Sequence, residues 1–418
     1  MKNLSPQAEL ANRHVMRAKD LGISQVSLDS ISKDGKTIKK NGKEIKYFTS
    51  CSYVGLENDA RLKKGAMEAL ENYGVQFSSS RAFLEIPLYA ELESLLSKIF
   101  GKPTLLAPTT TLGHMSLIPL FIGSKDAVIL DQQVHNSIQT TIGLAKSTGT
   151  HVEIVRHNRI DLLEEKINEL RLKYEKVWYM ADGVYSMLGD LAPINKLHEL
   201  MNQYDNFYCY IDDAHGMSWT GGNGAGHVFN KKAHHDKMIF ITTLAKGFGV
   251  AGSAMVFPNE EMKNLVRNIS PALMFSGPIQ PPNLGALIAS AKIHLSDEIY
   301  ERQEKVHDLI TYFNITARGF NLPLVNNDLS PIFFIGVGTP DVGFDICKKM
   351  LDSGYYLNIA AFPAVPFKNT GLRVTVTHHQ NVQDIFEMLE TLAKHFGHLE
   401  NKKHIVRTEI HKAFSLAN

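Results

Sequence analysis

The sequence predicts an α/β protein with a large domain built on a mostly parallel sheet and a smaller α+β domain. Short apolar runs rich in β-branched residues alternate with helical patterns between about residues 100 and 260. Near-continuous apolar strands that alternate with helices are typical of a parallel sheet covered on both faces. A different pattern follows Pro281-Pro282. The length of 418 residues also suits a large domain together with a smaller one.

The elements of the large domain follow in chain order. The segment 161–170 is an amphipathic helix, and similar stretches separate the strands. Ligands in such sheets bind at the carboxyl ends of the strands, so residues that follow a strand are the candidates for a site. The expected strands are 127–130, 151–155, 176–180, 207–211, 238–243 and 253–257.

Four regions are expected along the chain. An N-terminal segment, 1–45, packs with the small domain, the large domain spans 46–290, and the small domain spans 291–400 with strands at 331–335 and 372–377. The extension 401–418 carries basic and apolar residues at mixed spacing. We expect a solvated or frayed helix there, and a docking surface for a carrier protein is the alternative.

Composition excludes several classes of function. The chain has 44 Lys and Arg against 43 Asp and Glu, so no overall charge favours nucleic acid or an anionic membrane. No apolar run reaches the length of a membrane span, and the first residues form no signal peptide, which favours the cytoplasm. Cys51, Cys209 and Cys347 are scattered, which predicts free thiols and no metal site.

The residues that follow two of the expected strands are candidates for catalysis. The strand 207–211 is followed by Asp212, Asp213 and His215, and the strand 238–243 is followed by Lys246 among small residues. Burial favours the neutral form of a lysine amine, which can then form a Schiff base. A carboxylate on a neighbouring strand can keep a pyridinium nitrogen protonated. These are the two groups that an enzyme dependent on pyridoxal 5'-phosphate (PLP) must supply.

Three stretches in the right order, 181–193, 211–216 and 242–247, resemble the α-oxoamine synthases, a family of fold-type I PLP-dependent transferases. The resemblance runs from about Ser50 to Ile385. Members of this family condense an L-amino acid with an acyl thioester and release the carboxylate as carbon dioxide, giving an α-aminoketone. The resemblance therefore implies a C-acyltransferase that is a homodimer with its active site at the interface.

The resemblance makes Lys246 the Schiff-base lysine and the base at the α-carbon of the substrate. A surface lysine that merely ends a strand is the alternative, but glycines such as Gly247 around it favour close approach of a cofactor. Asp212 matches the partner of the pyridinium nitrogen, although a carboxylate at a strand end can also cap a helix. We leave Asp213 as that cap or as a loop carboxylate.

Three further residues match groups around the cofactor ring. His215 matches a histidine near the phenolic oxygen and the reacting carbonyl, and Ser186 matches a second donor at that oxygen. His135 matches a histidine that lies flat on the pyridine ring. Without the resemblance, His215 would be read as a satisfied core histidine and His135 as an ordinary loop histidine.

The remaining matches concern phosphate and carboxylate groups. Thr243 matches a phosphate-binding hydroxyl, although threonine is common in strands for its β-propensity alone. Arg373 matches the arginine that clamps the substrate carboxylate, for which a bidentate guanidinium is suited. Thr110 and Thr111 replace part of a Ser-Gly-aromatic turn under the phosphate, where a helix N-terminus favours the anion. Ser276 stands in the segment that matches the family's Tyr-Ser-Thr, whose threonine reaches the neighbouring subunit's phosphate. Either Ser276 substitutes for that threonine or the contact between subunits is missing.

The chain departs from the family pattern at several places. Cys51 stands where an asparagine is common, and Tyr89 stands where a histidine is usual. The turn under the phosphate reads 109–114 without its glycine, and the Tyr-Ser-Thr segment reads 275–277 with Phe, Ser and Gly. These changes cluster around the amino-acid pocket and the acyl entrance, so we expect the chemistry to be kept with unusual substrates.

The sequence thus predicts a PLP-dependent enzyme that joins an amino acid to an acyl-CoA or acyl-carrier thioester. Another fold-type I PLP enzyme, an aminotransferase or a retro-aldol lyase, would share Asp212 and Lys246 but would not predict the stretch 182–190. A non-catalytic PLP-binding module fused to a DNA-binding domain is the other alternative. The chain has no helix-turn-helix pattern and no basic arm, which disfavours that alternative.

Overall fold

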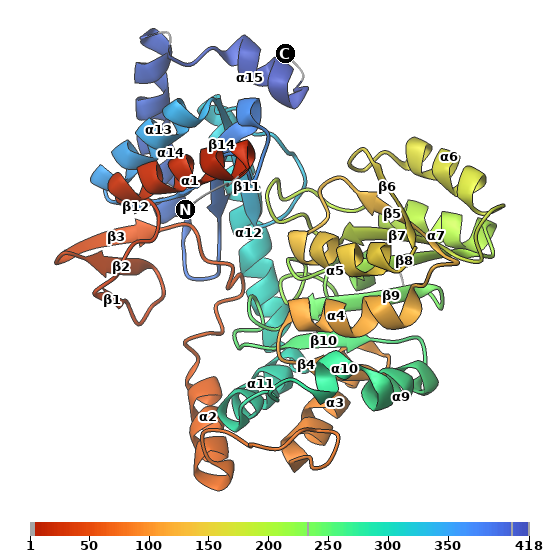
Figure 1. Ribbon diagram of the computed structural model, residues 1–418. Coiled ribbons are helices and arrows are strands. Elements are labelled where there is room, and N and C mark those ends of the chain that lie inside the picture. The colour runs from red at the N-terminus through yellow and green to blue at the C-terminus, as the bar shows by residue number, and fades with distance from the viewer. Residues whose placement is uncertain (1–4, 232–233, 403, 417–418) are drawn as a thin grey trace. The chain divides into compact units, whose positions relative to one another are not determined.

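The computed structural model describes residues 5–231, 234–402 and 404–416 (Figure 1). The chain divides into two compact units. The large unit contains Val54–Ser186 and Leu191–Gln303, and the small unit contains Met1–Tyr53, Met187–Asp190 and Glu304–Asn418. Helix α12 (Glu298–Gly319) carries the chain from the large unit into the small one.

The large unit is built on a seven-stranded sheet with the strand order β4-β10-β9-β8-β7-β5-β6. Strands β5 to β9 pair in parallel, and β10 is antiparallel to both of its neighbours. The predicted mostly parallel sheet is therefore confirmed. The strands are β4 (Thr104–Ala107), β5 (Ala127–Asp131), β6 (His151–Val155), β7 (Val177–Asp182), β8 (Phe207–Asp212), β9 (Met238–Thr243) and β10 (Ser253–Val256).

The six strands expected from the sequence agree with β5 to β10 to within two residues at each end. The sequence reading missed β4. This strand has only four residues, all buried, and such a short apolar run cannot be distinguished by periodicity from the helix before it.

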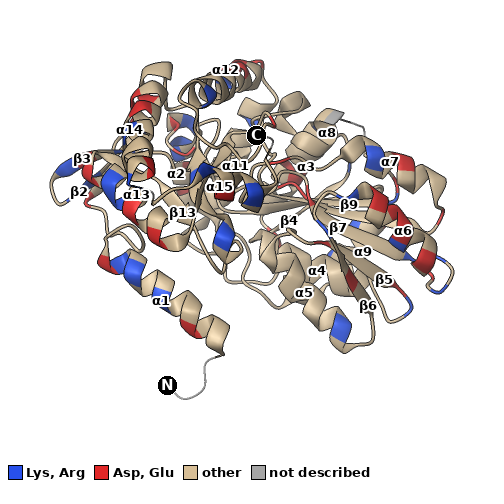
Figure 2. Cartoon of the chain, turned by 90° about the horizontal axis from the view of Figure 1, so that it is seen from above, with Lys and Arg blue, Asp and Glu red and all other residues tan. Residues whose placement is uncertain are grey.

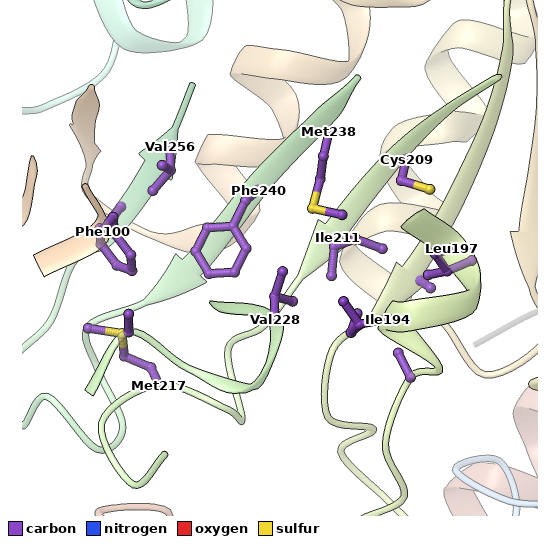
Figure 3. Close-up of a cluster of buried hydrophobic side chains, with 14 of the residues drawn as sticks. Phe100, Ile194, Leu197, Cys209, Ile211, Met217, Val228, Met238, Phe240 and Val256 are labelled. Atoms are coloured by element: carbon purple, nitrogen blue, oxygen red, sulfur yellow. The ribbon is translucent and has the colours of Figure 1, made fainter. Parts of the chain in front are cut away.

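Side chains along each strand alternate between two apolar clusters, one on each face of the sheet. Cys209 and Ile211 of β8 lie in one cluster, which contains Leu197 of helix α7 and is shown in Figure 3. Tyr210 lies in the other cluster, with Ile118 of helix α4. Helices α3 (Pro87–Phe100), α6 (Ile160–Leu170) and α7 (Ile194–Gln203) contribute to the first cluster, and α4 (Thr110–Phe121) and α5 (Asn136–Ser147) to the second.

The outer faces of α6 and α7 carry charges of both signs, as Figure 2 shows. Lys166 pairs with Glu169 on α6, and Lys196 pairs with Glu199 on α7. Their apolar residues face the sheet, so the pattern is that of amphipathic surface helices. Within the described residues, no helix is long and apolar enough to cross a membrane. The other helices of this unit are α2 (Ala60–Tyr73), η1 (Gly222–Gly224), α8 (His227–Lys231), α9 (Glu260–Ile269), α10 (Pro271–Met274) and α11 (Pro281–His294).

The small unit contains two small sheets. One has the order β1-β2-β3-β12 and the other the order β11-β14-β13. The predicted strands 331–335 and 372–377 correspond to β11 and β14. The strands are β1 (Ser30–Ile31), β2 (Thr37–Lys40), β3 (Lys43–Tyr47), β11 (Ile332–Gly338), β12 (Tyr355–Tyr356), β13 (Asn358–Ala360) and β14 (Thr370–Thr375), and the helices are α1 (Pro6–Asp20), α13 (Pro340–Asp352), η2 (Phe367–Asn369), α14 (Val382–Asn401) and α15 (Arg407–Phe414).

The C-terminal extension is packed rather than solvated, which corrects the sequence-based expectation. Ile405 and Ile410 are buried. A side chain at Gly336 of β11 would collide with Ile410 and Phe414, so α15 lies directly on that strand. The ring of Phe414 also packs against that of Phe334 in a tilted arrangement, with 5.7 Å between the ring centroids. The extension completes the apolar core of the small unit, and the mixed spacing of its apolar residues concealed this role.

Candidate active site

The alternation along the strands brings several polar residues to one place. Asp182 ends β7 and Asp212 ends β8, each two residues beyond a side chain of the cluster that α4 and α5 cover. Thr243 ends β9 on the same face. A cavity of about 300 Å³ opens there, at the carboxyl ends of the strands. It is lined by Thr109, Thr110, Thr111, His135, Ser137, Asp182, Val184, Asp212, Ala214, His215, Thr243 and Lys246.

Two helices begin at the cavity. Thr109 caps α4, and its hydroxyl oxygen accepts a hydrogen bond from the backbone N–H of Leu112 at 3.2 Å. His135 caps α5 in the same manner through the N–H of Ser137. The positive ends of both helix dipoles, with the hydroxyls of Thr110 and Thr111, therefore favour an anionic group in the cavity.

Asp212 is an almost fully buried carboxylate with two defined partners. Oδ1 accepts a hydrogen bond from the backbone N–H of Ala214 at 2.9 Å, and Oδ2 lies 3.1 Å from Nε2 of His114. Burial acts to raise the pKa of Asp212, but the hydrogen bond with His114 and the positive charge of Lys246 hold this pKa below its ordinary value. Asp212 is therefore ionised at neutral pH.

Asp182 lies opposite Asp212 in the register of the parallel pair β7 and β8. Its Oδ1 accepts a hydrogen bond from the backbone N–H of His135 at 3.0 Å. Burial and then the negative charge of Asp212 raise the pKa of Asp182 well above its ordinary value. Two buried carboxyl groups at neighbouring strand ends cannot both hold a charge, and the structure assigns the charge to Asp212.

Two hydrogen bonds, one to the ring and one to the backbone, hold His135 at the cavity. Its Nδ1 lies 2.7 Å from the hydroxyl of Ser137, and its backbone is fixed by Asp182. Loss of water around the ring lowers the pKa of His135, with the positive charge of Lys246 adding to this effect and the charge of Asp212 opposing it. The imidazole is therefore neutral at neutral pH and presents an uncharged ring to a ligand.

Asp213 is fully buried and plays a different role from its neighbour. Its Oδ2 accepts a hydrogen bond from the backbone N–H of Val228 in α8 at 3.1 Å. A Cβ atom at Gly183 or Gly216 would lie within 2.3 Å of its Oδ1, so this carboxyl group occupies space that only glycine leaves open. Burial raises the pKa of Asp213 to about 8. Of the two roles that the sequence allows for Asp213, a helix cap or a loop carboxylate, the contact with α8 is that of a cap.

Seven of the predicted site residues line the cavity. Ser186 and Ser276 also belong to the large unit but are not among the lining residues. Arg373 belongs to the small unit, where it is buried on β14 with its guanidinium 3.7 Å from the sulfur of Cys51. The roles assigned to all ten residues stay predictions. The seven are Thr110, Thr111, His135, Asp212, His215, Thr243 and Lys246.

Tyr89, which stands where the family pattern has a histidine, is a structural residue. Its hydroxyl accepts a hydrogen bond from the N–H of Ile279 at 2.7 Å, and the guanidinium of Arg81 lies 3.8 Å from the centre of its ring. Burial raises the pKa of Tyr89 to about 12. Tyr89 thus anchors the segment that follows Ser276 and is not among the cavity-lining residues.

Sequence reasoning missed His114 and Tyr210. His114 is completely buried on α4, and its Nδ1 lies 2.8 Å from the hydroxyl of Tyr210 on β8. A histidine within the mostly apolar segment 112–118 was the available signal. The contact with Tyr210 could not be found in this way, because it joins residues 96 positions apart in the chain.

A family model and named relatives each match most of this chain. The family model described as "Aminotransferase class I and II" matches residues 48–389. The 8-amino-7-oxononanoate synthase of Thermosipho melanesiensis is 29% identical over 368 residues, which cover 87% of this chain and 91% of the relative. The enzyme with the same name from Alkaliphilus metalliredigens is 29% identical over 362 residues, which cover 85% and 89%.

Solved structures share the fold. Serine palmitoyltransferase of Sphingomonas wittichii superposes with a TM-score of 0.84 at 21% identity, covering 93% of this chain and 97% of that one. For 8-amino-7-oxononanoate synthase of Francisella tularensis the TM-score is 0.73 at 19% identity, with coverage of 85% and 98%. At these identities the likeness shows the fold.

The raised pKa of Asp213 predicts a pH-dependent stability. Its folded-state pKa of about 8 exceeds its ordinary value of 3.8, so the folded protein binds more protons between these values. This group therefore lowers the free energy of unfolding as the pH rises from about 4 to about 8, by at most about 6 kcal/mol. We expect Asp213→Asn to flatten this part of the stability profile, measured by chemical denaturation. The exposed Asp205→Asn is the control, and an unchanged slope in Asp213→Asn would contradict the assignment.

Proposed function

Because the chain belongs to the aminotransferase class I and II family, we propose that its cavity binds PLP and catalyses the condensation of an L-amino acid with an acyl thioester. The predicted resemblance to the α-oxoamine synthases, the fold-type I architecture and the PLP cofactor are confirmed by the family match and the named relatives. The observation that carries the proposal is the gathering of Lys246, Asp212 and His135 in one cavity.

The donor set of the cavity fits the cofactor. An amine at Lys246 can hold the aldehyde carbon, and the ionised carboxylate of Asp212 can pair with the pyridinium nitrogen. The hydroxyls of Thr110, Thr111 and Thr243 and the N-terminus of α4 suit the phosphate. The volume of about 300 Å³ lies in the range of small-molecule sites.

When bound, PLP supplies an electron sink that lets bonds at the α-carbon of an amino acid break. Asp212 keeps the ring nitrogen protonated, which maintains that property. Lys246 removes the proton from the α-carbon of the amino acid once its amine is released. His135 would lie against the ring, and His215 would donate a hydrogen bond near the reacting carbonyl oxygen. The deprotonated α-carbon would attack the carbonyl carbon of the thioester and displace the thiol, and loss of the carboxylate as carbon dioxide would then give an α-aminoketone.

Arg373 is the residue that we propose for binding the substrate carboxylate. Arg373 is 7% exposed, and its Nη2 lies 3.7 Å from the sulfur of Cys51. A guanidinium suits bidentate binding of a carboxylate. Since Cys51 replaces a common amide at this point, we propose that the amino acid is held differently from that of the relatives. Acyl-CoA and acyl-carrier thioesters are both candidates for the second substrate.

The reaction has a direct test. Purified protein is expected to show a visible absorbance band that is absent in Lys246→Ala and present in the exposed-lysine control Lys292→Ala. With one member of a panel of L-amino acids, it should release a thiol from acyl-CoA or an acyl carrier together with carbon dioxide. Arg373→Ala should raise the KM for that amino acid at least about tenfold.

Two results would contradict the proposal. A band that survives unchanged in Lys246→Ala would remove the cofactor assignment. Formation of pyridoxamine phosphate from the amino acid, without thiol release, would instead indicate an aminotransferase.

We further propose that the protein is a homodimer. Phe83 is 84% exposed and Phe275 is 86% exposed, which is unusual for such large apolar side chains. The segments that carry them are joined by a hydrogen bond from the Ser80 hydroxyl to the carbonyl of Met274 at 2.7 Å. Val75 and Leu84 are exposed in the same region. A second copy of the chain would cover these side chains.

Sedimentation equilibrium tests the dimer. The wild-type protein should have twice the mass of one chain, and the double variant Phe83→Lys with Phe275→Lys should shift toward the monomer. Leu172→Lys, at a residue that is 78% exposed elsewhere in the large unit, should stay dimeric. A monomeric wild-type protein would contradict the proposal.

A further inference from the structure

A line of three buried polar side chains leads away from the cavity behind Asp212. Oδ2 of Asp212 lies 3.1 Å from Nε2 of His114, and Nδ1 of His114 lies 2.8 Å from the hydroxyl of Tyr210. His114 is 0% exposed and Tyr210 is 1% exposed. Tyr210 precedes Asp212 by two residues on β8, so both side chains point to the face that α4 covers.

The positions of the protons in this line can be counted. Tyr210 has one hydroxyl proton, and within the described part of the chain His114 is the only side chain within hydrogen-bond distance of it. If Tyr210 donates to Nδ1, that nitrogen carries no proton, and the proton of a neutral His114 must be on Nε2. Nε2 then donates to Oδ2 of Asp212, which must be an unprotonated acceptor.

The two other arrangements leave a buried donor without a described acceptor. If His114 were doubly protonated, its Nδ1 would donate to Tyr210, and the hydroxyl proton would have no acceptor among the described residues. If Asp212 were protonated and donated to Nε2, Nδ1 would carry the proton and the same conflict would arise. Only an ionised Asp212 satisfies every group in the line.

We propose that Tyr210 and His114 form a positioning relay that selects the tautomer of His114 and thereby keeps Asp212 ionised. The relay rests on the proposed function only for its effect on PLP, because its contacts belong to the protein itself. The lowered pKa of Asp212 is consistent with it. Without the relay, the proton shared between Asp212 and a pyridine nitrogen would move toward the carboxylate, and the ring would lose its positive charge.

Tyr210 should therefore influence the protonation of Asp212, although its hydroxyl reaches Asp212 only through His114. Removal of its hydroxyl frees His114 to carry its proton on Nδ1, which turns a bare Nε2 toward Asp212 and favours protonation of the carboxyl. A neutral ring makes the imine nitrogen at Lys246 more basic. The pH at which the visible absorbance band changes, measured without substrate, should therefore rise.

The experiment uses four variants of the PLP-bound protein. His114→Leu and Tyr210→Phe should each raise the midpoint of the spectral pH titration by about one unit or more. The double variant should shift no further than His114→Leu, since both changes break the same line. His114→Gln should stay near the wild type, because its amide can donate to Asp212 without help from Tyr210. The buried His294→Gln, which bonds Ser218 instead, is the matched control.

A Tyr210→Phe midpoint equal to that of the wild type, or a double variant that shifts by the sum of the two single shifts, would overturn the relay. Circular dichroism and binding of PLP show whether each variant folds. A merely structural role of the two side chains would lower stability without moving the spectral midpoint, and that result would also overturn the proposal.

A second measurement separates the relay from the proposed function. In protein free of PLP and labelled with ¹⁵N-histidine, the signals of His114 are identified by their loss in His114→Gln. They should report a neutral ring with its proton on Nε2, and in Tyr210→Phe the proton should move to Nδ1. A proton on Nδ1 in the wild type would overturn the relay even if the enzyme condenses its substrates. Absence of a visible band in the PLP-treated wild type would instead contradict the proposed function alone.

Discussion

The structure of the site depends on one buried negative charge, that of Asp212 at the end of β8. A carboxylate that is only 4% exposed must be compensated, and three groups do this from different elements. The backbone N–H of Ala214 and the ring of His114 donate to it, and Lys246 contributes a positive charge. The neighbouring Asp182 adapts by staying protonated, and its carboxyl oxygen holds the backbone of His135. The charge thus links α4, α5 and three strands at one point.

The sheet explains why these groups meet. Strands β7, β8 and β9 are parallel and adjacent, so their carboxyl ends lie side by side. The period of two then places Asp182, Asp212 and Thr243 on the face covered by α4 and α5. Because both helices begin at this edge, their dipoles favour an anion there. The fold therefore supplies a carboxylate and an anion site a short distance apart, as a phosphorylated pyridine cofactor requires.

Most strands of the large sheet, and the two residues central to the site, could be predicted from the sequence. Strands β5 to β10 are apolar runs with clear limits, and Asp212 and Lys246 could be recognised because each follows such a run. His114 could not be assigned, because its function depends on a contact with β8 that periodicity does not reveal. The burial of Ile410 could not be predicted for a related reason. The surface at Gly336 that Ile410 contacts forms only when the small unit folds. Local patterns predict elements, whereas contacts distant in sequence decide which polar residues cooperate.

The ionised state of Asp212 depends on where the protons of the neighbouring groups lie. Neutron diffraction from crystals of the deuterated, PLP-bound protein would locate them directly. We expect deuterons on the carboxyl of Asp182, on Nε2 of His114 and on the hydroxyl of Tyr210, with none on Asp212. A deuteron on Asp212 together with one on Nδ1 of His114 would contradict it.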